Sequence, residues 1–230
     1  MLNSMKSKVA TLLLVGSALL TTGCGAAIQI EAAPPAPNTT EHQDDYRQAL
    51  KTLETIDQKG RAPKTGYSRD QFGKGWKDPD RNGCDSRNDI LARDLRDLTY
   101  KGTSDCVVAS GKLDDPYTGK QIDFLRGQRT STAVQIDHVV ALSDAWQKGA
   151  QQWSAEQRLL FANDPLNLLA VDGPANAAKS DKDAATWLPS NKSFRCDYVA
   201  RQTEVKAKYG AWMTKAEHAA IKDLLTRCLT

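Results

Sequence analysis

Four polar side chains in the second half of the chain have the types and spacing needed for hydrolytic chemistry. Asp137 and His138 are adjacent, and Asn167 and Asn176 follow in two later segments. Histidine has an unperturbed pKa of about 6.5, so His138 can take a proton from water near neutral pH. A hard divalent cation held by oxygen ligands stabilises charge on a phosphate, and Asp137 and Asn176 carry such oxygens. These residue types predict metal-dependent cleavage of a phosphodiester.

Two apolar runs and a turn must position these side chains. The Asp-His pair ends the run 133–136, and Asn167 lies inside a second run, 166–171. Asn176 follows a Gly-Pro turn that can open a helix, which gives the order strand, long loop, strand, helix. Neighbouring strand residues point to opposite faces, so the pair can share one centre only where the strand ends or bends. A buried turn residue and a helix cap are the structural alternatives for the two asparagines.

The motifs around these residues resemble the HNH, or ββα-metal, nucleases, and most closely the secreted HNH proteins related to the C-terminal domain of GmrSD-type restriction endonucleases. The resemblance covers residues 67–228. Its most specific parts are IDHVVALSDAW (136–146), NDPLNLLAV (163–171) and NAAKSDKD (176–183), with YSRDQFGKGWKDPDRNGCDSRNDIL (67–91) as an accessory block.

The resemblance implies a role for each polar residue. Asp137 would ligate the metal and Asn176 complete its site, His138 would be the general base, and Asn167 would orient the base or its loop. Lys179, one helical turn after Asn176, would face a phosphate. The cofactor implied is Mg²⁺ or Mn²⁺. Many HNH domains carry a structural zinc on two CxxC pairs, but this chain has no CxxC, so no structural zinc is expected.

The fold class expected is α+β, with an HNH core at 130–185 embedded in additional helices and a small β-hairpin region and stabilised by disulfides. The patterns that predict these added elements are helices at 44–57, 89–100, 193–209 and 214–229, and hairpin strands at 107–110 and 121–124 around a turn at 116–119.

The first 23 residues have the charge order of an export leader. Lys6 and Lys8 precede an apolar stretch, 9–20, that is shorter than the roughly 20 residues needed to span a bilayer. The residues ending at Cys24 resemble a bacterial lipobox, so Cys24 is a lipidation candidate and ordinary secretion is the alternative. We therefore expect a signal peptide at 1–23, a flexible tether at 24–43, an HNH domain at 44–230, and a secreted or lipid-anchored location outside the cytoplasm.

Cysteine usage agrees with export. Without Cys24 an even number remains, which suits two disulfides in an oxidising compartment: Cys84, Cys106, Cys196 and Cys228. Three pairings are open. The shorter sequence loops favour Cys84 with Cys106 and Cys196 with Cys228, and zinc ligation is the competing use.

The charge balance excludes a strong global attraction to polyanions. The formal net charge is +3, and removing Lys6 and Lys8 with the leader leaves +1. Local contacts to phosphate are expected from Arg87 and Arg129, because guanidinium groups match phosphate oxygens. His218 is expected on the solvated surface.

Two classes of function remain open. The first is an extracytoplasmic endonuclease, monomeric, acting on DNA or alternatively on RNA. The second is a non-catalytic envelope lipoprotein or binding module that retains the fold.

Overall fold

The computed structural model describes residues 39–103 and 105–230. The predicted leader, most of the tether and the lipidation candidate Cys24 lie outside the described residues. Among the helices of the described ranges, none has the length and apolar character needed to cross a bilayer.

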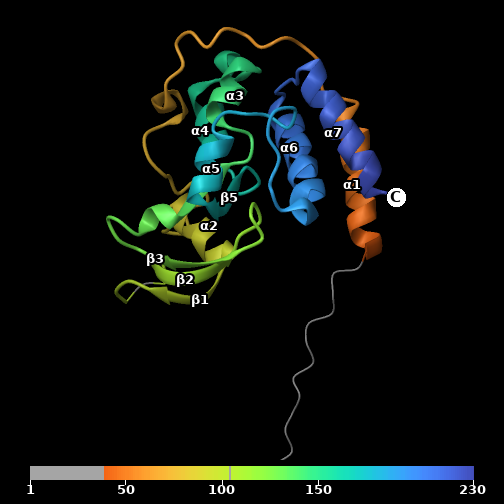
Figure 1. The fold of residues 1–230 in the computed structure, drawn as a ribbon. Helices are drawn as coiled ribbons and strands as arrows, with labels where there is room; N and C mark the ends of the chain where they lie inside the picture. Colours follow the sequence, from red (N-terminus) through yellow and green to blue (C-terminus); the bar gives the residue numbers. More distant parts are fainter. Residues whose placement is uncertain (1–38, 104) are drawn as a thin grey trace, which may run out of the picture. The chain divides into compact units, whose positions relative to one another are not determined.

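The described chain is a mixed α+β structure, as expected (Figure 1). Its strands form two separate sheets, one of three strands and one of two. In chain order the elements are α1 (Thr39–Leu53), η1 (Arg69–Phe72), α2 (Ser86–Asp94), β1 (Leu95–Tyr100), β2 (Val108–Asp114), β3 (Gln121–Leu125), η2 (Ser131–Ala133), β4 (Val134–His138), α3 (Leu142–Gln147), η3 (Ala150–Gln152), α4 (Ala155–Asn163), β5 (Leu168–Asp172), α5 (Gly173–Lys179), η4 (Lys192–Phe194), α6 (Arg195–Tyr209) and α7 (Lys215–Cys228).

The two-stranded sheet and the helix that follows it carry the residues with chemical potential. β4 pairs antiparallel with β5, so that Asp137 lies opposite Leu169 and His138 opposite Leu168. Successive residues of β5 pack into different apolar clusters, Leu169 into one and Leu168 into the other. Both faces of this strand are therefore buried, which explains why its sequence is a continuous apolar run.

Helix α5 begins directly after β5 and packs against both strands. Asp172 caps it, because its side chain accepts a hydrogen bond from the backbone N–H of Ala175 at 2.7 Å. A Cβ atom on Gly173 would lie 2.1 Å from the carbonyl oxygen of Thr132. Only glycine fits this close approach, so Gly173 fixes where α5 starts relative to β4.

The three-stranded sheet corrects one prediction. The helix expected at 89–100 ends at Asp94, and the residues after it form β1. β1 pairs with β2, with Leu95 opposite Leu113 and Thr99 opposite Ser110. Pairing with a neighbouring strand thus overrides the helical spacing of the leucines. The predicted hairpin is confirmed, as β2 and β3 pair antiparallel around its turn.

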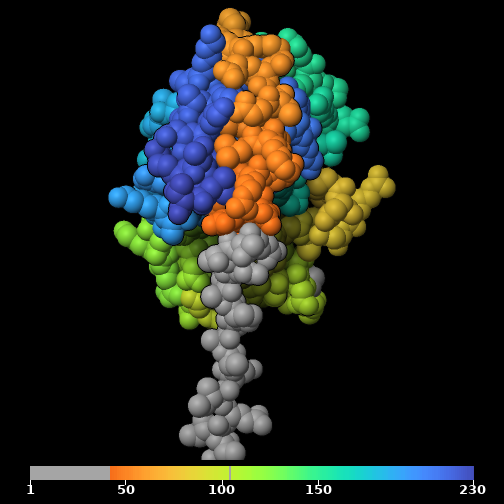
Figure 2. Space-filling view, turned by 90° about the vertical axis from the view of Figure 1, so that its right-hand side faces the viewer, coloured from red at the N-terminus to blue at the C-terminus, as the bar shows by residue number. Residues whose placement is uncertain are grey.

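Helices α1, α6 and α7 pack side by side. Figure 2 shows α1 in orange along the surface, with the dark blue α7 beside it. α1 begins at Thr39, ahead of the predicted start at 44. Gly210 caps the C-terminal end of α6, and its φ of 66° is a left-handed conformation that favours glycine. The predicted helical pair at 193–209 and 214–229 is confirmed.

Both predicted disulfides are present. Cys84 and Cys106, with Cα atoms 5.3 Å apart, join the segment before α2 to the β1–β2 connection. Cys196 and Cys228, with Cα atoms 6.1 Å apart, join the first turn of α6 to the end of α7. By loop-closure entropy each bridge contributes about 3 kcal/mol.

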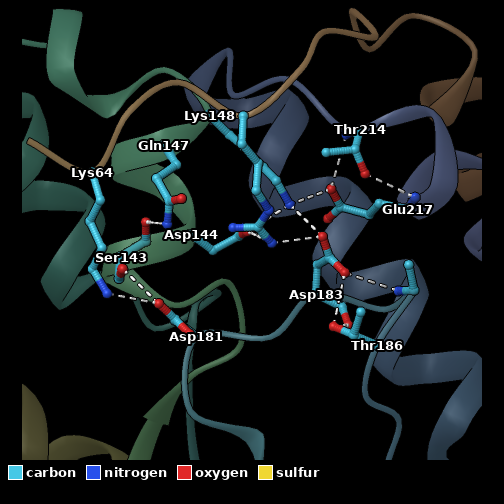
Figure 3. Close-up of polar contacts among 12 residues, drawn as sticks. Lys64, Ser143, Asp144, Gln147, Lys148, Asp181, Asp183, Thr186, Thr214 and Glu217 are labelled. Atoms are coloured by element: carbon cyan, nitrogen blue, oxygen red, sulfur yellow. Dashed lines mark hydrogen bonds and ion pairs between the residues drawn. The ribbon is translucent and has the colours of Figure 1, made fainter.

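A network of buried charges joins the helices to the segment after α5 (Figure 3). Lys148 is fully buried and lies 2.8 Å from Asp183 and 2.7 Å from Glu217. Lys206, also fully buried, pairs with Asp144 at 3.0 Å and with Glu217. Arg61, whose side chain is 33% exposed, adds a third cation at the edge of the network, 2.9 Å from both Asp144 and Asp183. The three cations offset the three carboxylates, so the network is neutral as a whole.

The network sets the charge state of its carboxylates. Burial alone would raise the pKa of Asp183, but the hydrogen bond and charge of Lys148 and the charge of Arg61 outweigh burial and lower the pKa to about 2. The ordinary value is 3.8. Because the folded-state pKa is the lower one, this carboxylate stabilises the fold fully above about pH 4. Its contribution is lost as the pH falls through about 2.

Replacing Lys148 with methionine should lower the free energy of unfolding by about 3 to 5 kcal/mol, because it leaves buried carboxylates without their shared cation. Urea unfolding at pH 7 measures the difference. The difference from wild type should narrow between pH 4 and 2, where Asp183 takes up a proton.

Lys222→Met is the matched control. It removes an ion pair with Glu54 in which both side chains are more than half exposed, and it should leave stability unchanged. Equal stability of Lys148→Met and wild type would contradict a supporting role for the network.

Candidate functional site

A pocket of about 410 Å³ opens where β4 and α5 meet. Asp137, His138 and Asn176 all line it, so the structure brings together three of the four polar residues singled out in the sequence. The remaining lining residues come from η1 and its flanking segment, from β4 and α3, and from the residues after α5: Lys64, Tyr67, Arg69, Gln135, Ile136, Ala141, Leu142, Ser143, Ser180 and Asp181.

Asp137 is buried, and both of its carboxylate oxygens have partners. The Tyr117 hydroxyl donates to Oδ2 at 2.5 Å, and the Lys179 ammonium lies 3.0 Å from Oδ1. Burial raises the pKa of Asp137, and the charge of Lys179 and the hydrogen bond from Tyr117 oppose that rise. These two partners favour the ionised form of a carboxylate that lies in an apolar interior.

Lys179 occupies a different place from the one predicted. Its side chain has no exposed surface, and its ammonium donates to Asp137 and, at 2.8 Å, to the carbonyl oxygen of His138. A buried ammonium needs a nearby anion, and Asp137 is in contact with it. In this structure Lys179 is therefore the counterion of Asp137, and it does not line the pocket.

His138 is fixed in one neutral tautomer. Its Nε2 lies 2.9 Å from the carbonyl oxygen of Ala162, and since a carbonyl only accepts, Nε2 carries the proton and Nδ1 keeps a free lone pair. The Trp76 ring stacks on the imidazole, with centroids 5.7 Å apart and planes 9° from parallel. Burial first, and then the positive charge of Arg69, lower the pKa of His138 to about 3. The imidazole is therefore neutral near pH 7.

The contacts of Asp137 and His138 lie on different sides of β4. Asp137 contacts Tyr117 and Lys179, whereas His138 contacts Trp76 and Ala162. Both nevertheless line one pocket because β4 ends at His138. The structure thus confirms the predicted end of the strand at the Asp-His pair.

Asn167 is fully buried and braces the loop that follows β4. Its Oδ1 accepts from the N–H of Val140 at 2.8 Å, and its Nδ2 donates to the carbonyl oxygens of Val140 at 3.3 Å and Phe161 at 3.4 Å. Phe161 precedes Ala162, the residue that holds His138. Asn167 thus connects the loop after His138 to α4, the helix whose Ala162 contacts His138.

Asn176 is half-buried on α5, with its amide oriented by a neighbouring strand residue. Its Nδ2 donates to Oε1 of Gln135 at 2.9 Å, which identifies the other amide atom as the free oxygen. Gln135 was not recognised in the sequence. Gln135 lies two residues before Asp137 on the same strand, and this spacing could have indicated that the two side chains share a face.

The donors at the pocket fit one kind of divalent cation. Asp137 and Asn176 offer one carboxylate and one amide oxygen, a set suited to Mg²⁺ or Mn²⁺, which keeps several waters and is completed by substrate phosphate. Within residues 39–103 and 105–230, no three His, Cys, Asp or Glu side chains form a group that could hold a metal ion. Two protein oxygens alone would form an open site and not a closed protein cage.

Two cationic residues at the pocket were missed in the sequence. Arg69 is exposed and lines the main pocket as well as a smaller one of about 100 Å³ on the other side of His138. Lys64 is also at the rim, 3.0 Å from Asp181 and 5.3 Å from the centre of the Tyr67 ring. Arg69 lies within the accessory block recognised upstream, but its distance along the chain from His138 gave no sign of proximity.

The arginines chosen from the sequence lie elsewhere. Arg87 is half-buried, with Nη2 3.5 Å from the carbonyl oxygen of Val134, and Arg129 is exposed. Neither residue lines the two pockets beside His138. His218 is another difference, because it is only 6% exposed and its Nε2 is buried without a hydrogen-bond partner among the described residues.

Comparisons with known proteins agree with the sequence motifs. The chain is 33% identical over 204 residues to an "uncharacterized secreted protein" of Arthroderma benhamiae, an alignment that covers 88% of this chain and 95% of the relative. No solved structure matches the chain. The model of the family described as "GmrSD restriction endonucleases, C-terminal domain" matches residues 85–224, which include every element from α2 to α6. The chain therefore belongs to the family of the GmrSD restriction endonuclease C-terminal domain.

Proposed function

We propose that the protein is a metal-dependent HNH endonuclease that hydrolyses phosphodiester bonds of nucleic acid, with DNA as the first substrate and RNA as the alternative. The observation that carries the proposal is the meeting of Asp137, His138 and Asn176 at one pocket. Membership of a nuclease-related family supports it. So does the order β4, β5, α5, two antiparallel strands and a helix as expected for a ββα-metal core.

His138 is the proposed general base. The carbonyl oxygen of Ala162 holds its Nε2 proton, so Nδ1 is free to take a proton from an attacking water. The ring is neutral near pH 7, and Trp76 and the Asn167 brace limit its movement. A pKa of about 3 is lower than suits a general base near pH 7, so this role requires that the approach of an anionic phosphate raises it. Asn167 acts here by positioning the base.

Asp137 and Asn176 are the proposed metal ligands. When bound, Mg²⁺ or Mn²⁺ would stabilise the charge that builds on the phosphate and on the leaving oxygen. The chain's own contribution is to present the Asp137 side chain, paired with Lys179, and an Asn176 oxygen whose direction Gln135 sets.

Arg69 and Lys64 are the proposed phosphate contacts. Both are exposed cations at the rim of the pocket that holds His138, and Lys64 also pairs with Asp181, whereas Lys179 is buried against Asp137. Contacts of this kind fix the register of a strand and carry little base readout. The modest net charge agrees with local rather than long-range attraction.

We propose that the protein acts outside the cytoplasm as a monomer. The two disulfides and the secreted relative support export. Lipid anchoring through Cys24 and free secretion are the two proposed forms of the mature chain.

A non-catalytic binding module of the cell envelope that retains the fold is the second candidate. The observation that favours it is that Tyr117 and Lys179 already occupy both oxygens of Asp137. Incubation of the mature protein with plasmid DNA and with RNA, in Mg²⁺ or Mn²⁺ and with EDTA, separates the candidates. Cleavage that EDTA abolishes supports the nuclease, and intact nucleic acid under every metal condition supports the module.

His138→Ala should lower the cleavage rate by about 10²-fold or more, because it removes the group that takes the water proton. The melting temperature verifies that the variant is folded. His42→Ala, on helix α1 and outside the pocket, is the control and should cleave like wild type. A folded His138→Ala protein that cleaves at the wild-type rate would exclude His138 as the base.

Asn176→Ala should weaken Mn²⁺ binding, measured by calorimetry, because the site loses one of its few protein oxygens. Asp137 needs a double variant, Asp137→Asn with Lys179→Met, since changing Asp137 alone leaves a buried ammonium unpaired. The double variant should also bind Mn²⁺ more weakly than wild type. Asp123→Asn, an exposed residue of β3, controls for loss of surface charge. Wild-type affinity in both site variants would place the metal elsewhere.

Arg69→Gln should lower kcat/KM for DNA roughly tenfold and reduce by about one the slope of log binding constant against log salt concentration, as loss of one phosphate contact does. Arg129→Gln is the matched control, an exposed arginine outside both pockets. A larger effect at Arg129 than at Arg69 would contradict this assignment.

A further inference from the structure

The turn of the β2–β3 hairpin enters the interior next to the proposed metal ligands. Tyr117, at the tip of this turn, has no exposed surface. The strands on either side of the turn belong to the three-stranded sheet, which shares no strand with β4 and β5. A side chain from a separate sheet therefore reaches the site.

Tyr117 is held from several directions. Its ring packs edge-on against Trp187 and Tyr198, with centroid distances of 5.0 and 5.7 Å. Its carbonyl oxygen accepts from the Ser190 hydroxyl at 3.0 Å and from the N–H of Asn191 at 2.9 Å. Because these contacts hold the ring and the backbone of Tyr117, its hydroxyl donates to Oδ2 of Asp137 from a fixed position.

The same turn is also fixed to the end of β5. Asp115 is 1% exposed, and its Oδ1 accepts from the N–H of Asp172 at 2.9 Å. Its Oδ2 accepts from the N–H and the hydroxyl of Thr118, which closes the turn. Asp172 caps α5, the helix that carries Asn176. One turn thus contacts Asp137 of β4 and Asp172, the residue that caps α5.

We propose that Tyr117 is a positioning residue for the metal site, which aims the carboxylate of Asp137 from behind the pocket and with Asp115 aligns β4 and α5. This inference rests on the proposed function. Hydrogen-bond partners that orient metal ligands typically affect metal affinity or activity by 10- to 100-fold when they are removed. The hairpin is by this account part of the site and not only a support for the fold.

Tyr117→Phe keeps the ring and removes only the hydroxyl. It should weaken Mn²⁺ binding by roughly tenfold in calorimetry. Tyr198→Phe is the matched control, because Tyr198 is equally buried beside Tyr117 and its hydroxyl contacts Gln202 instead of Asp137. It should bind Mn²⁺ like wild type. Similar melting temperatures of the two variants would exclude general loosening as the cause.

A second measurement reads the contact without metal. The ¹³C signal of the Asp137 carboxyl carbon should move in Tyr117→Phe and stay in Tyr198→Phe. An unmoved signal would show that the contact is absent and would overturn the inference. A moved signal with unchanged Mn²⁺ affinity would overturn the positioning role alone. A wild-type protein that binds no Mn²⁺ would contradict the proposed function, and the inference would fall with it.

Discussion

A buried charge must have a partner of opposite sign, and this requirement governs the interior of the protein. Lys148, Lys179 and Lys206 have no exposed surface, and each contacts at least one carboxylate. These ion pairs join segments that are distant in sequence: the end of β4 to α5, α3 to the segment after α5, and α6 to α7. Such pairs need not exceed a well-packed apolar core in stability, but removal of one partner is costly. They therefore restrict how the helices can be arranged around β4 and β5.

The candidate site is assembled by three parts of the chain with different tasks. The end of β4 presents Asp137 and His138, and α5 brings Asn176 to the same pocket. The β2–β3 turn contacts Asp137 from the interior side. Because Asp137 and His138 are buried and hydrogen-bonded to neighbouring parts of the chain, the two side chains have little freedom to move. Preorganisation of this kind is what hydrolytic chemistry at a phosphate requires.

The sequence predicted the parts of the site that depend on local order. The strand end at His138, the helix after the Gly-Pro turn and both disulfides follow from residue type and spacing, and the structure has them. Other features depend on tertiary contacts that spacing does not contain. Residues 95–100 form a strand because they pair with β2. Lys179 is buried because it pairs with the carboxylate of Asp137. Arg69 could not be found from the sequence, because only folding brings η1 to the pocket that His138 lines.

The contrast between buried and exposed charges implies different responses to ionic strength. Dissolved ions screen exposed charges over a Debye length of about 8 Å at physiological salt, but they screen buried pairs much less. Arg69 and Lys64 are exposed, whereas the pairs of Lys148 and Lys206 are enclosed. Added salt should therefore weaken attraction to a polyanion while leaving the ion pairs of the interior intact. A bound polyanion would therefore dissociate at a salt concentration well below the one that unfolds the protein.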